Sequence, residues 1–155
     1  MKEINSKITF DFDNMSLNAT VIGDGLYDEK LGIQINKNSE LGYSVNVVNG
    51  VVDNIFISIT PSFNDGYSAF LGSFKIRGEI LNLDKISSTE YVKSNFGKPV
   101  SHWNDGVEEN LQFIVMKYRI EFSWNVGNLN TCLSYVSVES ECVCPVVPSR
   151  RPIEC

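Results

Sequence analysis

The chain has 155 residues, a length that fits a single domain. Hydrophobic residues make up 43% and charged residues 21%, so the composition excludes a wholly disordered chain and predicts a packed core. The formal net charge of −6 argues against nucleic-acid partners, because binding to a phosphate backbone gains its affinity from Lys and Arg. The same acidity favours a basic protein partner, although moderate net charge also serves solubility alone.

The charge is spread unevenly along the chain. Residues 1–65 carry nine acidic and four basic side chains. Residues 66–100 carry three acidic and five basic side chains, and residues 101–155 carry seven acidic and four basic side chains. The N-terminal sequence MKEINSKITFDFDN lacks the apolar stretch of a signal peptide, and no run approaches the roughly 18 apolar residues of a membrane helix. We therefore expect a cytoplasmic protein with no membrane partner.

Apolar and polar residues alternate through much of the first half, which is the pattern of half-buried antiparallel strands. This alternation predicts strands over residues 7–13, 17–22, 30–36, 43–48 and 51–60. Asp13 and Asn14 predict a turn between the first two strands. The Asn49-Gly50 pair predicts a tight hairpin between the last two, because a type I′ turn needs positive φ at both central positions.

One helix is predicted, over residues 88–96. It follows a loop at 61–66, a strand at 70–77, a turn at Gly78-Glu79 and a strand at 80–83. Ser87 or Ser88 can cap its N-terminus, and Gly97 with a following proline predicts its end. A helix of about ten residues is marginal alone, so it must pack against a sheet.

The last third of the chain predicts a meander and a tail. Residues 101–110 (SHWNDGVEEN) are polar and predict a loop, and strands follow at 111–116, 118–124 and 129–138. Residues 140–155 contain three prolines within eight positions, so we expect a tail outside a single domain of residues 1–139. The predicted fold is α+β and mainly antiparallel β, with one or two curved antiparallel sheets and one short helix packed on them.

The sequence carries no recognisable catalytic motif. His102 is the only histidine, and a Ser-His-Asp or Cys-His site would need a nucleophile and an acid beside it. Cys132, Cys142, Cys144 and Cys155 lack the C-x2-C spacing typical of zinc sites, so free thiols, or a disulfide formed in the tail after purification, are expected instead. We expect a protein that is not an enzyme and holds no cofactor and no metal.

Large aromatic residues in polar segments are the candidate binding residues, since aromatic side chains often anchor protein interfaces. The alternative is that some of these rings, such as Trp103 and Phe63, fold back onto the core. Acidic residues close by in the sequence can surround the aromatic residues with negative charge. The partner-binding set predicted in this way is Asp65, Tyr67, His102, Trp103, Asp105, Glu108 and Glu109.

Residues 70–124 resemble a known family. They run FLGSFKIRGEILNL, ISSTEYVKSNFGKP, a polar segment with HW and DG, and KYRIEFSW. This order is similar to the small cytoplasmic immunity proteins encoded beside bacterial polymorphic toxins, including contact-dependent growth inhibition systems. In that family a strand pair with a G-x-I/L motif precedes a helix ending in G-x-P, and a β-meander follows. The spacing from Thr89 to Val92 is tighter here than in the family pattern.

The resemblance implies a non-enzymatic inhibitor that binds one cognate toxin domain, many of which are nucleases with basic clefts. It implies a heterodimer with that toxin domain and no nucleic-acid or membrane partner. The helix with G-x-P is also similar to modules of β-lactamase inhibitors and outer-membrane assembly lipoproteins. The alternative is therefore a non-catalytic, protein-binding adaptor of that kind.

Overall fold

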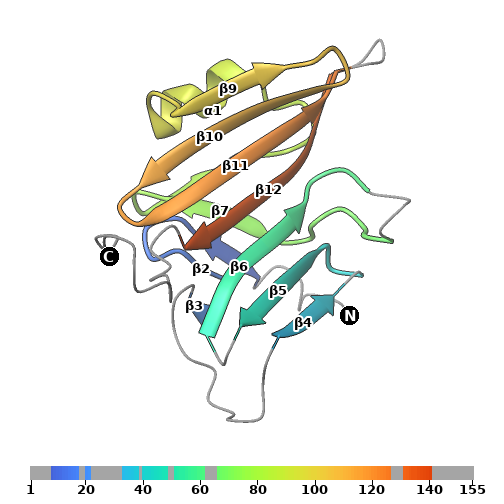
Figure 1. The fold of residues 1–155 in the computed structure, drawn as a ribbon, viewed down its shortest axis with the longest axis vertical. Coiled ribbons are helices and arrows are strands. Elements are labelled where there is room, and N and C mark those ends of the chain that lie inside the picture. The colour runs from blue at the N-terminus through green and yellow to red at the C-terminus, as the bar shows by residue number, and fades with distance from the viewer. Residues whose placement is uncertain are drawn as a thin grey trace, which may run out of the picture.

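The computed structural model describes residues 8–17, 20–21, 33–38, 40–48, 51–61, 66–126 and 131–140, and it places them in two sheets and a helix (Figure 1). The larger sheet has seven antiparallel strands. Their spatial order is β4 (Ile33–Asn38), β5 (Tyr43–Val48), β6 (Val51–Ser58), β12 (Cys132–Ser140), β11 (Tyr118–Asn125), β10 (Glu108–Val115) and β9 (Ser101–Asn104). This architecture confirms the predicted α+β class with mainly antiparallel strands.

The smaller sheet has five short strands, one pair of which is parallel. Their order is β3 (Thr20–Val21), β2 (Ser16–Leu17), β1 (Thr9–Asp11), β7 (Ser73–Ile76) and β8 (Glu79–Leu81). The parallel pair is β1 with β7, in which Phe10 lies opposite Phe74. This pairing joins the N-terminal part of the chain to residues more than sixty positions later, which local alternation in the sequence does not reveal.

The helix α1 (Thr89–Phe96) is close to its predicted position. Ser88 is the N-cap, and its Oγ accepts a hydrogen bond of 3.1 Å from the Tyr91 backbone N–H. Ser87 instead stabilises the preceding turn, because its Oγ accepts from the Asp84 backbone N–H. Gly97 ends the helix at φ 92° and ψ −146°, a conformation that strongly favours glycine but lies outside the left-handed helical region.

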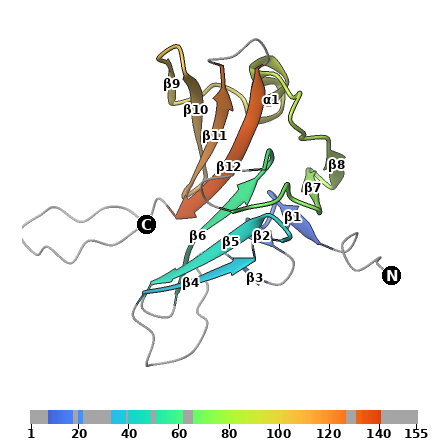
Figure 2. The same cartoon turned by 90° about the vertical axis from the view of Figure 1, so that its right-hand side faces the viewer.

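The helix and the five-stranded sheet lie on the same face of the seven-stranded sheet (Figure 2). Phe96 joins these three parts: its ring centroid lies 5.0 Å from that of Phe12, 5.7 Å from Phe113 and 5.2 Å from Phe122. Trp124 is 1% exposed, and its indole N–H donates to the Ser87 carbonyl oxygen before the helix. The apolar residues of all three parts therefore form one core.

Some predicted boundaries were wrong. The polar residues 101–110 contain β9 and the start of β10 rather than a loop, because the two segments pair with each other around a turn at Asp105 and Gly106. The strand predicted at 17–22 is interrupted, and its two ends pair with each other as β2 and β3.

Of the two predicted hairpins, one agrees with the strand pairing and the other has its turn at a different position. Val48 pairs with Val51, which agrees with a two-residue hairpin, while Asn49 and Gly50 themselves lie outside the described residues. The turn between β7 and β8 is Arg77-Gly78, one residue earlier than predicted, because Ile76 pairs with Glu79 and both intervening residues have positive φ.

Other predictions fall outside the described part of the chain. These concern the loop positions 62–65, including Asp65 and Phe63, and the tail from residue 141 onward. Among the described residues, no helix has the length and apolar character that a membrane span requires.

Candidate functional site

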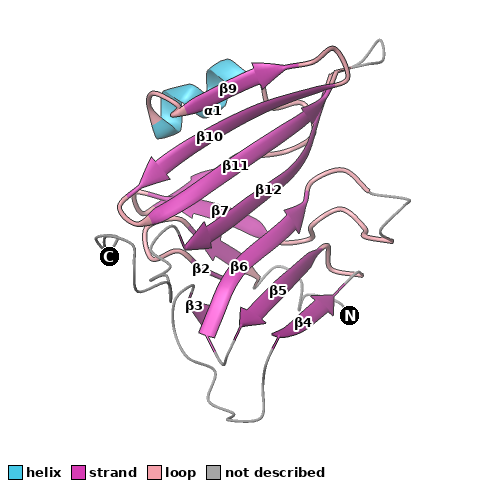
Figure 3. Ribbon diagram, viewed as in Figure 1, coloured by secondary structure: helices cyan, strands magenta, loops and turns pink. Residues whose placement is uncertain are grey.

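Among the described residues, α1 and the five-stranded sheet cover one face of the seven-stranded sheet, and no helix or strand covers the other. In Figure 3 the viewer looks at the open side, with the helix behind β9 and β10. Strand register assigns alternate residues to each side, since successive side chains point to opposite faces. We call the side away from the helix the open face. Its side chains on five neighbouring strands include Asn54, Phe56, Ser58, Ser101, Trp103, Glu108, Asn110, Gln112, Ile114, Arg119, Glu121, Ser123, Tyr135, Ser137 and Glu139.

A hydrogen-bonded chain of side chains runs across the middle of the open face. The Arg119 guanidinium donates to Gln112 (2.5 Å), the Gln112 amide donates to Asn110 (3.1 Å), and the Asn110 amide donates to Glu121 (2.6 Å). The phenol of Tyr135 donates to the same Glu121 oxygen at 3.1 Å. Asn110 is fully buried under its neighbours, so this chain holds the side chains in one arrangement.

A second carboxylate lies beside the first on this face. Glu108 accepts a hydrogen bond from the hydroxyl of Ser123, which is 1% exposed. Burial raises the pKa of Tyr135 far above its ordinary value of 10, and the carboxylates of Glu121 and Glu108 raise it further. Tyr135 therefore remains a neutral donor, while the centre of the face carries two carboxylates.

Aromatic rings lie at both ends of this polar centre. On the β6 side, the ring of Phe56 lies 5.1 Å from those of both Tyr67 and Tyr135. On the β9 side, Trp103 lies opposite Asn110 and is 42% exposed. The open face thus has an acidic, hydrogen-bonded centre between aromatic groups, an arrangement that suits a protein interface.

The structure brings together some of the predicted binding residues and separates others. Tyr67, Trp103 and Glu108 belong to the open face. His102 and Glu109 lie on the opposite side of β9 and β10, where Nε2 of His102 and Oε2 of Glu109 are 2.7 Å apart. The predicted set is therefore not one continuous surface, because adjacent positions in a strand point in opposite directions.

Asp105 lies in the turn between β9 and β10. Its Oδ1 accepts from the backbone N–H groups of Val107 (2.9 Å) and Glu108 (2.8 Å). These hydrogen bonds lower the pKa of Asp105, the bond from Glu108 having the larger effect. The carboxylate thus stabilises the turn that positions Trp103 and Glu108.

Sequence reasoning missed most of the polar centre. Glu121, Asn110 and Tyr135 were not among the predicted binding residues. The alternation over 118–124 does place Arg119, Glu121 and Ser123 on one side of a strand, which was a usable signal. Finding Asn110 and Tyr135 beside them requires the pairing of β11 with both β10 and β12.

No group of three or more His, Cys, Asp or Glu side chains suited to a metal ion occurs among the described residues. Cys132 is half-buried at the start of β12, opposite Asn125. Cys142, Cys144 and Cys155 lie outside the described residues.

Comparison with protein-family models, curated proteins and solved structures found no match to this chain.

Proposed function

We propose that this chain is an immunity protein that binds and neutralises a cognate bacterial toxin domain in the cytoplasm, and that the toxin domain docks on the open face. The observation that carries the proposal is the hydrogen-bonded acidic centre of that face, flanked by Trp103 and by Phe56 with Tyr67. In this proposal the chain inhibits the toxin domain by covering part of its surface, and the chain itself carries out no chemical step.

Charge favours a basic partner surface. The open face of β6 and β9–β12 carries the carboxylates of Glu108, Glu121 and Glu139 and the single guanidinium of Arg119. A nuclease domain presents a basic cleft to its substrate, so an acidic face can occupy that cleft and accelerate the encounter through long-range attraction. Aromatic anchors supply the affinity that exposed charge pairs do not.

The size of the open face supports the same proposal. Five strands at about 4.8 Å spacing and about eight residues at about 3.3 Å rise give a patch on the order of 500 Å² before side-chain relief is counted. A standard interface buries about 800 Å² on each partner, so the patch with its flanking turns is of the required scale. The hydrogen-bonded centre adds rigidity, which lowers the entropy lost on binding.

Co-expression tests the proposal. The toxin domain encoded beside this chain's gene is expressed with a tagged copy of this chain, and the mixture is passed over affinity and sizing columns. We expect a stable one-to-one complex, and growth of the host only when this chain is present. A demonstrably toxic neighbour that neither binds this chain nor is neutralised by it would refute the proposal.

A further inference from the structure

A pocket of about 370 Å³ lies away from the open face, where three tight turns meet the end of α1. The β1–β2 turn contributes Phe12, Asp13 and Met15, and the β7–β8 turn contributes Arg77. The remaining lining residues, from β7, α1 and the β10–β11 hairpin, are Ile76, Asn95, Phe96, Val115 and Met116. Its volume lies within the range of about 300–1,000 Å³ that small-molecule sites usually occupy.

The turns around the pocket adopt an unusual backbone conformation. Met15, Arg77 and Met116 have φ values of 52°, 53° and 56°, and they are the non-glycine residues with positive φ in the described part of the chain. All three line this one pocket. A non-glycine residue at positive φ is strained, and glycine at the same position would not be. Three such strained residues surround this pocket, and backbone strain of this kind tends to occur at ligand sites.

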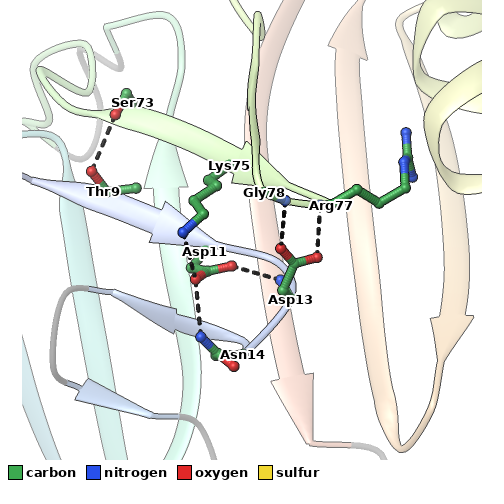
Figure 4. A network of polar contacts seen from close by, with 8 residues as sticks. All are labelled: Thr9, Asp11, Asp13, Asn14, Ser73, Lys75, Arg77 and Gly78. Atoms are coloured by element: carbon green, nitrogen blue, oxygen red, sulfur yellow. Dashed lines mark hydrogen bonds and ion pairs between the residues drawn. The ribbon is translucent and has the colours of Figure 1, made fainter.

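Hydrogen bonds hold the polar rim of the pocket in place. Asp13 accepts from the backbone N–H groups of Arg77 (2.7 Å) and Gly78 (3.0 Å), which ties two of the turns together (Figure 4). The Arg77 side chain extends away from Asp13 (Figure 4). Its Nη1 donates to the backbone oxygen of Asn95 at 3.0 Å, and its Nη2 donates to Oδ1 of the same residue at 3.0 Å. The guanidinium is therefore fixed beside the C-terminal turn of α1.

The guanidinium keeps donors for a ligand. An arginine has five N–H groups, and two of them contact Asn95. No carboxylate of the described residues forms an ion pair with Arg77. The remaining N–H groups can form a two-point contact with an anionic carboxylate, a geometry for which arginine is well suited.

The walls of the pocket favour an aromatic ring. Phe12 and Phe96 meet edge to face with their ring centroids 5.0 Å apart, and the thioether of Met116 is a polarisable group that contacts aromatic rings favourably. Met116 is 70% exposed at the rim and can adjust to an entering group. We propose that this pocket binds an aromatic ring carrying a carboxylate, with the carboxylate on Arg77. The ligand is either a free arylacetate or the C-terminal aromatic residue of a peptide.

Titration of the full chain with indole-3-acetate, followed by amide chemical shifts, tests this proposal. We expect saturable shifts concentrated at residues 12–15, 76–78, 95–97 and 115–117. Tryptamine carries the same ring with a cationic group and should bind at least tenfold more weakly. A peptide ending in a free C-terminal tryptophan, compared with its C-terminal amide, separates the two sources of the ligand, because the amide lacks the carboxylate. Absence of saturable shifts in these turns with the acid and with the free peptide would overturn the proposal, as would equal affinity for acid and amine.

Two variants locate the contact. Arg77→Gln keeps a long side chain at the same backbone position and should weaken indole-3-acetate binding about tenfold, while leaving the weak binding of uncharged indole unchanged. Lys75→Gln removes the same charge from β7, the strand that leads into the Arg77 turn, at a position outside the pocket lining, and should change neither affinity by more than about twofold. Equal losses in both variants, with unchanged melting temperatures, would show general charge attraction and contradict the assignment to Arg77.

Discussion

The two faces of the seven-stranded sheet obey the same alternation but are stabilised in different ways. On the covered face, Phe122 and Trp124 are buried by apolar contacts with α1 and the core. On the open face, Asn110 and Ser123 are equally buried, yet beneath polar neighbours that hydrogen-bond to them. Burial alone therefore does not identify the core here. On the open face, the buried polar residues are held by hydrogen bonds to neighbouring side chains rather than by packing against another layer of the fold.

The chain has two tryptophans, one on each face, and they offer the sharpest comparison. Trp124→Ala should destabilise the fold by about 3–5 kcal/mol, because it opens a cavity in the core and leaves the Ser87 carbonyl without its indole donor. Chemical denaturation measures this loss as a lower midpoint. A loss below about 1 kcal/mol would mean that the covered face is not the core of the domain.

Substitutions in the hydrogen-bonded centre of the open face should cause the next largest loss of stability. Glu121→Ala should cost about 1–3 kcal/mol, because the buried amide of Asn110 and the phenol of Tyr135 lose their acceptor. Glu121→Gln retains one amide oxygen and should cost less. If both variants unfold at the wild-type midpoint, the network contributes nothing to the stability of the fold.

The same network predicts how Tyr135 titrates. Its raised pKa means that the folded protein favours the neutral phenol, so this stabilisation is present below pH 10 and is lost as the pH rises above 10. Ultraviolet absorbance during alkaline titration should show this tyrosine ionising above its ordinary pKa of 10. Glu121→Gln should lower its pKa only in part, since burial is the larger cause. An unchanged titration curve in Glu121→Gln would argue against the contact.

The helix that covers the core depends on its cap. Ser88→Ala should destabilise the domain by about 1 kcal/mol, because the Tyr91 backbone N–H loses its acceptor. This corresponds to a fall of about 2–4 °C in melting temperature for a domain of this size. Ser94→Ala on the exposed side of the same helix is the matched control and should be nearly neutral. Equal effects in both variants would remove the assignment of Ser88 as N-cap.

Substitution of Asp13 should have the smallest effect on stability, and this effect should depend on pH. Hydrogen bonds from the backbone of Arg77, then Gly78, hold its pKa below the ordinary value of 3.8. A lowered pKa stabilises the fold above pH 3.8, and this contribution is lost as the pH falls through the folded-state value. Asp13→Asn should therefore be slightly less stable than the wild type at pH 7 and equally stable near pH 2. A difference that persists at pH 2 would point to another cause.

The sequence predicted the strands with clear alternation, the helix and the fold class. In 118–124 the apolar positions Tyr118, Ile120, Phe122 and Trp124 all face the core, as the period of two requires. The parallel pairing of β1 with β7 was not predictable, because nothing local in either strand specifies a partner so far away. Residues 101–110 have the composition of a loop because β9 is an edge strand with polar side chains and the start of β10 is polar as well.

The candidate site was harder to predict than the fold. Residue type alone points to Trp103 and Glu108, which do share a face, whereas the adjacent His102 and Glu109 point to the other side. Neighbouring polar residues in a strand cannot share a surface, so a set chosen by sequence proximity mixes two faces. The polar centre forms only when β10, β11 and β12 pair in register.

The docking proposed for the open face is tested most directly by the affinity of the proposed toxin domain for Trp103→Ala, measured by calorimetry beside the wild type and Ile86→Ala. Ile86 is 78% exposed before the helix and serves as the control for loss of an exposed apolar side chain. We expect Trp103→Ala to keep the wild-type melting temperature within about 2 °C and to weaken binding by at least about 30-fold, while Ile86→Ala binds normally. Wild-type affinity in Trp103→Ala, with the complex intact, would contradict docking on the open face.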